Sequence, residues 1–248
     1  MTQHRQLWLD APARPLLADG EVHVWRSFLD KDRSAVQSLL EFLSPDEQKR
    51  AGKFHFQRDR EHFVVARGML RSILGRYLNV TPQQLGFTYN QYGKPALNRA
   101  TAADLLRFNV SHSHGLALFA ITPGREIGVD LEQVRADFVS LELAERFFSP
   151  AEVATLRALP PDARMTAFFN CWTRKEAYIK ARGEGLSHPL HRFTVSLSSG
   201  EPASLLSTDD EPDAAARWSL VELFPAECYR AALAIEGGRP LLRCWQAR

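Results

Sequence analysis

A pair of carboxylates in the middle of the chain has the spacing expected of a metal site. Asp130 and Glu132 lie at positions i and i+2 of the segment Gly128-Val129-Asp130-Leu131-Glu132. Residues two apart in a β-strand project from the same face, so these carboxylates would lie side by side. Like charges this close repel each other, and a shared hard cation such as Mg²⁺ relieves that repulsion. The alternative is an exposed strand end whose two acids point into water.

A second charged group follows on a predicted helix. The segment from Trp172 to Lys180 favours a helix that ends at Gly183, the left-handed residue typical of a helix C-terminus. Glu176 and Lys180 are four residues apart, so they can form an ordinary surface ion pair worth ~0.3–0.5 kcal/mol. The functional alternative makes Glu176 a third metal ligand or a general base, with Lys175 and Lys180 on phosphate groups. Spacing alone favours the ion pair.

Two further polar stretches could line a ligand site. Asn109, Ser111 and His112 directly precede an apolar segment at residues 116–121 that reads as a strand, so they lie where a ligand-facing loop is expected. Lys94 lies in a Tyr-Gly-Lys-Pro turn, a weak signal for a phosphate loop because it matches no Walker pattern. The stretch pairs serine with histidine, but no G-x-S-x-G elbow surrounds either serine, which argues against a serine hydrolase.

An internal duplication indicates how these groups are brought together. Residues 42–47 recur as residues 147–152, an offset of 105, and both copies contain the Ser-Pro-x-Glu pattern of a capped helix start. At the same offset, Leu70-Arg71 in the next helix of the first copy corresponds to Lys175-Glu176 in the second. We therefore expect one site shared by two diverged halves, with the helical carboxylate contributed by the second.

The predicted fold class is α+β, with two subdomains of similar plan at residues 1–123 and 124–248. In each, a short capped helix leads to a long helix and then to strands; the first long helix is expected from about Arg58 to Leu78. The turn around Pro123 marks the join. Residues 198–215, rich in Ser, Asp and Pro, are predicted to form a solvent-exposed loop.

Composition narrows the class of protein. The chain has 248 residues and a formal net charge of +2. This small net charge argues against duplex DNA as the main partner, and we predict no role in nucleic-acid binding. No apolar run approaches the ~20 residues of a membrane span, and no signal-peptide pattern follows Met1. Three cysteines without a C-x-x-C pair predict buried thiols in a reducing cytoplasm.

Charge is nevertheless unevenly distributed. Residues 49–76 contain eight Lys or Arg and two acids, a pattern that is usually a solvated helix face but can also attract phosphates or an acidic protein. We predict that Arg71 and Arg76 in this stretch help to bind an acidic partner.

Taken together, these segments resemble the Sfp-type 4′-phosphopantetheinyl transferases. The similarity is carried by W-x-x-K-E-A-x-x-K at residues 172–180, by G-x-D-x-E at residues 128–132, and by segments at residues 44–54, 92–95 and 108–113. The resemblance implies two α+β halves related by a pseudo-twofold axis, with the active site at their interface. It also implies that the phosphopantetheine arm of coenzyme A is transferred to a serine of an apo carrier protein, releasing adenosine 3′,5′-bisphosphate.

The resemblance assigns roles residue by residue. Asp130, Glu132 and Glu176 would hold Mg²⁺ on the pyrophosphate, and Glu176 would accept the serine proton directly or through water. Lys180 would also stabilise the leaving bisphosphate, and His112 would contact the 3′-phosphate. The coenzyme contacts implied by the resemblance are Arg50, Lys94, Asn109, Ser111, His112, Lys175 and Lys180.

One position departs from the family pattern. Phe63 stands where the family can place a hydroxyl against the nucleotide, and Arg67, one turn later, is expected to compensate. The attacking serine belongs to an acyl, peptidyl or aryl carrier protein of fatty acid, polyketide or non-ribosomal peptide synthesis, so the chain needs no nucleophile of its own. Because one chain supplies both halves, we expect a monomer.

Two other functions are compatible with the pattern. One is a carrier-binding module that has kept the fold and lost catalysis; the complete set of clustered acids argues against it, because such costly carboxylates would be lost without a function. The other is a Mg²⁺-dependent phosphohydrolase, which would need a positioned water and gives no reason for a two-lobed partner surface.

Overall fold

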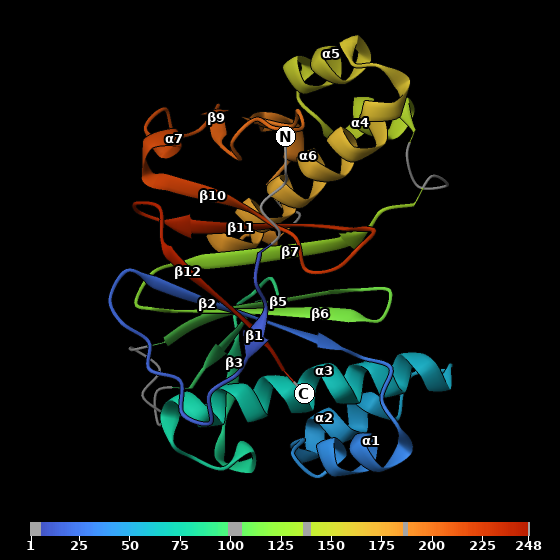
Figure 1. Ribbon diagram of the computed structural model, residues 1–248, viewed down its shortest axis with the longest axis vertical. Coiled ribbons are helices and arrows are strands. Elements are labelled where there is room, and N and C mark those ends of the chain that lie inside the picture. The colour runs from blue at the N-terminus through green and yellow to red at the C-terminus, as the bar shows by residue number, and fades with distance from the viewer. Residues whose placement is uncertain (1–5, 99–105, 136–139, 186–187, 248) are drawn as a thin grey trace.

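Two β-sheets lie face to face between two layers of helices (Figure 1). The computed structural model describes residues 6–98, 106–135, 140–185 and 188–247. The larger sheet has the strand order β1-β12-β2-β6-β5 and the smaller β10-β11-β7. Their bounds are β1 Leu9–Asp10, β12 Leu241–Gln246, β2 Glu21–Phe28, β6 Leu116–Pro123, β5 Leu106–Ser113, β10 Trp218–Leu223, β11 Tyr229–Glu236 and β7 Ile127–Gln133.

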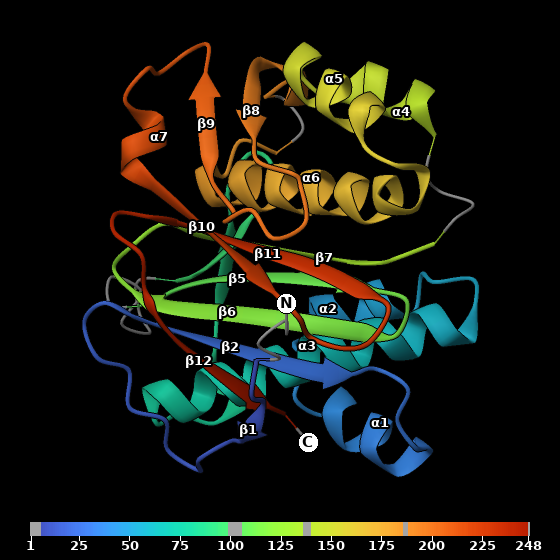
Figure 2. The ribbon, with the colours of Figure 1, turned by 45° about the horizontal axis from the view of Figure 1, so that its top comes forward.

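Helices cover the outer face of each sheet (Figure 2). The larger sheet carries α1 Arg33–Leu40, α2 Pro45–Ala51 and α3 Gln57–Leu78; the smaller carries α4 Leu141–Phe147, α5 Pro150–Ala158, α6 Pro161–Arg182 and α7 Ala214–Arg217. Two short ribbons, β3 Phe87–Tyr89 with β4 Pro95–Leu97 and β8 Phe193–Val195 with β9 Leu205–Thr208, and two 3-10 turns, Pro82–Gln84 and Leu190–Arg192, complete the described elements. The α+β fold class is thereby confirmed.

The capped helix starts predicted from the repeat are present in both halves. The Glu47 carboxylate accepts a hydrogen bond from the Ser44 backbone N–H (3.0 Å), and Glu152 accepts one from Ser149 (2.7 Å). The helices α3 and α6 that follow are both 22 residues long. Each ends on a left-handed residue, Asn79 with φ 53° or Gly183 with φ 73°, a common way to terminate a helix.

Alternation along β7 separates core residues from the predicted site. Ile127, Val129 and Leu131 are fully buried in the apolar layer between the two sheets. The intervening Asp130 and Glu132 therefore face α6, on the outer side of the smaller sheet. Burial of three large apolar side chains, each worth about 1.5–3 kcal/mol, makes a one-residue slip of this strand very unfavourable.

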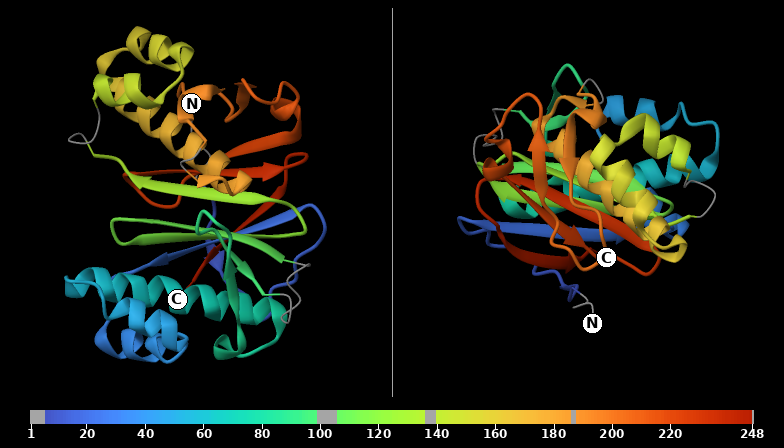
Figure 3. Two further views of the ribbon diagram at one scale, coloured as in Figure 1. Left: turned by 180° about the vertical axis from the view of Figure 1, so that it is seen from behind. Right: turned by 90° about the horizontal axis from the view of Figure 1, so that it is seen from above.

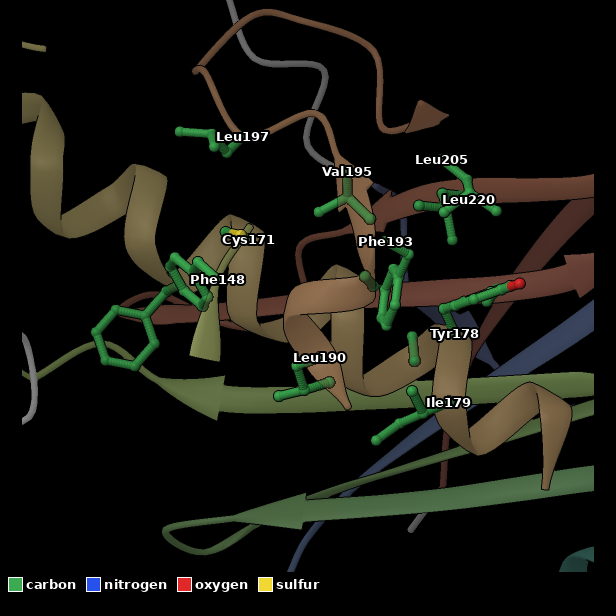
Figure 4. Packing of buried hydrophobic residues seen from close by; sticks show 14 of the residues in the cluster. Phe148, Cys171, Tyr178, Ile179, Leu190, Phe193, Val195, Leu197, Leu205 and Leu220 are labelled. Atoms are coloured by element: carbon green, nitrogen blue, oxygen red, sulfur yellow. The ribbon is translucent and has the colours of Figure 1, made fainter. Parts of the chain in front are cut away.

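A separate core lies beneath α6. Phe148, Tyr178 and Phe193 pack in it with smaller apolar residues from β10 and β11 (Figure 4), and the ring centroids of Tyr178 and Phe193 are 4.9 Å apart. A third apolar cluster joins α3 to the larger sheet. Each long helix is thus fixed to its own sheet by its own core.

Two expectations are wrong: the solvent-exposed loop at residues 198–215 and the burial of all three thiols. The segment 198–215 is not only loop: Leu205–Thr208 forms β9, which pairs with β8 and buries Leu205, because pairing overrides a polar composition. The C-terminal strand β12 pairs in parallel with β2 of the larger sheet, so the chain returns to the first half after completing the second (Figure 3). Of the cysteines, Cys171 and Cys244 are buried, whereas Cys228 is exposed, contrary to the prediction.

In the described part of the chain, every helix is too short or too polar to cross a membrane.

Gly128 allows β7 and α6 to approach backbone to backbone. A Cβ atom on this glycine would lie 2.1 Å from the Ala177 carbonyl oxygen and 2.4 Å from the Ala181 nitrogen, both atoms of the α6 backbone. Neither atom can move without the helix. The glycine of the G-x-D-x-E motif is therefore required for packing rather than for backbone flexibility.

We predict that Gly128→Ala lowers the free energy of unfolding by about 1–3 kcal/mol, because α6 must shift away from the sheet. Gly238→Ala is the matched control, since no atom lies within 4 Å of the added Cβ and it should unfold like the wild type. Thermal unfolding of the three proteins tests this; equal melting temperatures would contradict the close contact.

Candidate active site

Three of the predicted site residues meet where β5, β7 and α6 run side by side. Lys180 Nζ on α6 lies 2.6 Å from Asp130 Oδ1 on β7 and 3.0 Å from Ser111 Oγ on β5. Ser111 Oγ in turn donates a hydrogen bond to the same carboxylate oxygen, at 3.0 Å. The described residues show no ion pair between Lys180 and Glu176, so the alternative of an ordinary i, i+4 pair on the helix surface is wrong.

Glu132 lies one alternation further along β7. Its carboxylate accepts a hydrogen bond from Ser113 Oγ at 2.8 Å. Burial raises the pKa of Glu132, and the negative charge of Asp130 raises it further. The alternative that both acids simply point into water is therefore wrong: Asp130 is buried and Glu132 is half-buried.

Glu176 completes the acidic group from α6. Burial raises the pKa of Glu176 to about 7; the charges of Asp130 and Glu132 add to this effect, and Lys180 opposes it. Among the described residues, no hydrogen bond or ion pair engages its carboxylate. A half-buried carboxyl without a partner and with a pKa near neutrality is suited to accept a proton.

The donor chemistry of this group fits a hard divalent cation. Asp130 Oδ2 is buried and has no hydrogen-bond partner among the described residues, so it can accept a further ligand. The charge of Asp130 raises the pKa of Glu132, and the charges of both raise the pKa of Glu176, so these carboxylates repel one another. Within the described ranges, however, no three His, Cys, Asp or Glu side chains are gathered closely enough to enclose an ion. Lys180 provides the positive charge next to Asp130.

His112 borders the acidic group at the end of β5. Its side chain is exposed, but partial desolvation by the neighbouring chain lowers the pKa of His112, and the charges of Lys180 and His62 lower it further. His62, on the first turns of α3, is hydrogen-bonded to Asp30 at 2.8 Å. His62 could not be identified from the sequence, because only the tertiary fold brings this residue of α3 close to β5.

A cavity of about 680 Å³ lies at the opposite end of β5. Its walls come from both halves: the β3–β4 ribbon, the first residues of β5, and Glu126, Arg182 and Gly183. Lys94 is held in this wall, with Nζ 2.9 Å from Glu126 Oε2 and 2.8 Å from the Ala181 carbonyl oxygen. Glu126 and Arg182 were not predicted, since neither belongs to a recognisable motif.

Two more predicted coenzyme contacts have other surroundings. Asn109 is buried, and its Oδ1 accepts a hydrogen bond from the Val129 backbone N–H at 2.9 Å, so it joins β5 to β7. Arg50 is exposed on α2, with its guanidinium 5.3 Å from the centroid of the Phe63 ring. Phe63, which stands where the family can place a hydroxyl, thus provides an aromatic face on which the Arg50 guanidinium packs.

Lys175 is not brought to the site. It is 0% exposed, and its ammonium lies 2.8 Å from Glu152 Oε2 while donating to the carbonyl oxygens of Leu190 (2.8 Å) and Phe193 (2.5 Å). An ammonium with three partners and no solvent contact cannot reach a phosphate in this structure. Lys175 instead connects α6 to the capped start of α5.

The first half contains the same kind of connection. Arg71 is 2% exposed; its Nε lies 2.7 Å from Glu47 Oε2, and its Nη1 donates to the carbonyl oxygens of Pro82 and Leu85, both at 2.9 Å. Arg71 therefore corresponds to Lys175, an offset of 104, rather than to Glu176. The prediction that Arg71 binds an acidic partner is wrong, because its side chain is buried.

Two neighbouring residues of α3 have contacts of their own. Arg76 lies near the other end of the helix, over the Trp25 ring, away from the site residues. Arg67 is hydrogen-bonded to Glu47 Oε1 at 2.5 Å and stacks on Phe87, so it supports the β3–β4 ribbon beside the cavity.

Comparison with known proteins gives a consistent result. Residues 126–234 match the model of the 4′-phosphopantetheinyl transferase superfamily, and residues 30–123 match that of the 4′-phosphopantetheinyl transferase N-terminal region. The chain is 44% identical to the 4′-phosphopantetheinyl transferase HetI of Nostoc sp., over 96% of both proteins. It is 30% identical to Sfp of Bacillus subtilis over 70% of this chain and 76% of that protein. The solved holo-[acyl-carrier-protein] synthase of Thermotoga maritima covers 46% of this chain, matched over 64% of its own, with 21% identity and a TM-score of 0.37.

The burial of Lys175 leads to a prediction that separates structure from ligand binding. Lys175→Met should lower the free energy of unfolding by about 3–5 kcal/mol, because it leaves the Glu152 charge buried without its cation. For a chain of this length, that is a fall in melting temperature of roughly 6–20 °C. Coenzyme A affinity, measured by calorimetry below the transition, should stay unchanged.

Glu152→Gln breaks the same pair and should cost a similar amount of stability. A Lys175→Met protein with wild-type stability but without coenzyme binding would contradict this assignment and restore the phosphate contact.

Proposed function

The chain belongs to the 4′-phosphopantetheinyl transferase superfamily, and we propose that it transfers the phosphopantetheine arm of coenzyme A to a serine of an apo acyl, peptidyl or aryl carrier protein. The observation that supports this best is the order of groups along α6: the cavity at Gly183, then Lys180, then Glu176. Along this helix, a nucleotide-sized cavity is therefore followed by the Lys180 ammonium and then by the Glu176 carboxyl, which has no partner among the described residues.

The length of this line suits an elongated ligand. Glu126 lines the cavity and Asp130 lies four residues further along β7, a separation of ~13 Å at the rise of an extended strand. With its adenine in the cavity, the nucleotide would place its pyrophosphate beside Asp130 and Lys180 and its ribose 3′-phosphate toward His112, further along β5. Lys94 lines the cavity, Asn109 joins β5 to β7, and Arg67 supports the β3–β4 ribbon. Arg50 and His112 are exposed and available to phosphates.

A pyrophosphate beside three carboxylates would need a cation to neutralise the negative charge. We propose that Asp130, Glu132 and Glu176 hold Mg²⁺, which would neutralise phosphate charge as the bridging bond breaks. The buried, unpartnered Asp130 Oδ2 supports this. Two further residues complete the proposed site. Lys180 offsets the charge of the leaving bisphosphate, and Ser111 orients Lys180 and Asp130.

Transfer follows from these positions. The carrier serine Oγ forms a bond to the β-phosphorus of coenzyme A, while the bond from this phosphorus to the bridging oxygen breaks. Adenosine 3′,5′-bisphosphate leaves with the electron pair, and the serine proton passes to Glu176, directly or through a water. We further propose a cytoplasmic monomer, since one chain lines the cleft from both halves and its three cysteines are unpaired.

Mass spectrometry of an apo carrier protein incubated with the enzyme, coenzyme A and Mg²⁺ tests the proposal. The carrier mass should rise by one phosphopantetheine arm, and Glu176→Gln should slow this transfer by at least ~10²–10⁴-fold, the usual contribution of a general base. Coenzyme cleavage without a carrier would indicate a phosphohydrolase instead. Binding of the carrier without any gain in mass would indicate a binding module.

Glu176→Gln should also stabilise the metal-free protein. It removes one of three mutually repelling charges at nearly constant volume, so the melting temperature in a chelator should rise by about 2–6 °C for each ~1–1.5 kcal/mol gained. Mg²⁺ should stabilise the wild type more than this variant. Equal stabilisation of both proteins by Mg²⁺ would remove Glu176 from the metal site.

The contact between His112 and the 3′-phosphate is tested with a matched pair of ligands. His112→Ala should bind coenzyme A about 10- to 100-fold more weakly, the loss expected for one hydrogen bond to a charged group. It should bind 3′-dephospho-coenzyme A as the wild type does. A similar loss for both ligands in calorimetry would place His112 elsewhere on the coenzyme.

A further inference from the structure

The turn between α2 and α3 exposes aromatic side chains that no core covers. Residues 52–60 are all exposed; Phe56 is 66% exposed and Phe54 37%. Phe54 packs against Phe63, with ring centroids 5.3 Å apart, and among the described rings Phe56 contacts only His55. Exposed aromatic side chains that are held in place are typical of binding surfaces rather than of a solvated helix.

Positive charge surrounds these rings. Lys49, Lys53, Arg58 and Arg60 are exposed on the same turn and on the helix ends beside it, together with a single acid, Asp59. Arg58 lies 3.4 Å from Asp30. Lys49, Lys53 and Arg60 have no ion-pair partner in the part of the chain that the structure describes. We call this surface the α2–α3 lip: Lys49, Lys53, Phe54, Phe56, Arg58 and Arg60.

The lip lies at the end of the cleft opposite the cavity. His62, six residues after Phe56 and therefore ~9 Å along α3, is close enough to His112 for its charge to act on the imidazole. His112 ends β5, whereas the cavity is lined by Leu106 and Phe108 at its start. Figure 1 shows the start of α3 on the same side of the molecule as the end of β7, which carries Glu132.

We propose that the carrier protein docks on the α2–α3 lip, through an acidic surface that places an apolar side chain beside Phe56. The proposal rests on the proposed transferase function, because that reaction requires a protein serine to enter where the coenzyme leaves the cleft open. The adenine takes the cavity at the start of β5, so the serine enters from the opposite end of the cleft. Unpaired lysine and arginine side chains there select an acidic partner and accelerate its approach.

The competing occupant is a phosphate of coenzyme A itself. Arg50, next to the lip, is a coenzyme contact by resemblance, so it is left out of the test. Lys53→Glu combined with Arg60→Glu reverses charge at two lip positions, and Phe56→Ser removes the most exposed ring. Arg14→Glu and Leu16→Ser are the matched controls, an exposed cation and an exposed apolar side chain in the segment that leads into β2.

Steady-state transfer with separately varied carrier protein and coenzyme A decides between the occupants. For Lys53→Glu/Arg60→Glu, KM for the carrier should rise about tenfold at ~0.05 M salt and approach the wild-type value at ~0.5 M, where surface charges are screened. For Phe56→Ser, KM for the carrier should rise by a similar factor that does not depend on salt. In both variants kcat and KM for coenzyme A should remain those of the wild type and the controls.

Two results would overturn the docking proposal. An unchanged KM for the carrier would show that the lip is not the docking surface, and a raised KM for coenzyme A would show that it binds phosphate instead. Both results require an active wild-type enzyme. A wild type that modifies no carrier protein would refute the transferase function itself, so the two failures are distinguishable.

Discussion

The backbone contact between β7 and α6 at Gly128 is the constraint on which the site depends. Helix and strand approach so closely there that only a glycine fits. Because side chains alternate along β7, the same contact turns Asp130 and Glu132 toward the helix and leaves Val129 and Leu131 in the apolar layer. Lys180 can then reach Asp130, and Glu176, one turn earlier, faces the same acids.

The position of α6 is in turn fixed by a buried ion pair that the chain uses twice. Glu152 caps α5 and holds Lys175; Glu47 caps α2 and holds Arg71. In both halves the cation also donates hydrogen bonds to backbone carbonyl oxygens at the 3-10 turn that follows the long helix. Each pair therefore has the additional hydrogen bonds that make a buried ion pair tolerable. The capping pattern therefore does more than start a short helix: it supplies the acid that anchors the long one.

Much of the fold and of the acidic group could be predicted from sequence, because both depend on local patterns. Helix caps, strand alternation and the spacing of Asp130 and Glu132 are local, and the repeat indicated that two halves would share a site. The role of Lys175 was missed because adjacent helical residues project ~100° apart, so Lys175 and Glu176 face different surroundings. The repeat was aligned one residue out within the long helix because segment spacing hides local differences in length: α5 is two residues longer than α2, but the link from α5 to α6 is three residues shorter than the link from α2 to α3.

Residues that only the fold brings together could not be predicted at all. Glu126 and His62 come to the cleft from a strand start and a helix start far apart in the chain, and neither has a motif. The basic stretch 49–76 shows the limit most clearly. Arg67 and Arg71 of this stretch form ion pairs with Glu47 inside the protein. Lys53 and Arg60, in contrast, face solvent. Net charge along a sequence therefore overstates the positive surface available to a partner, and the available part is concentrated where α3 begins, next to the cleft.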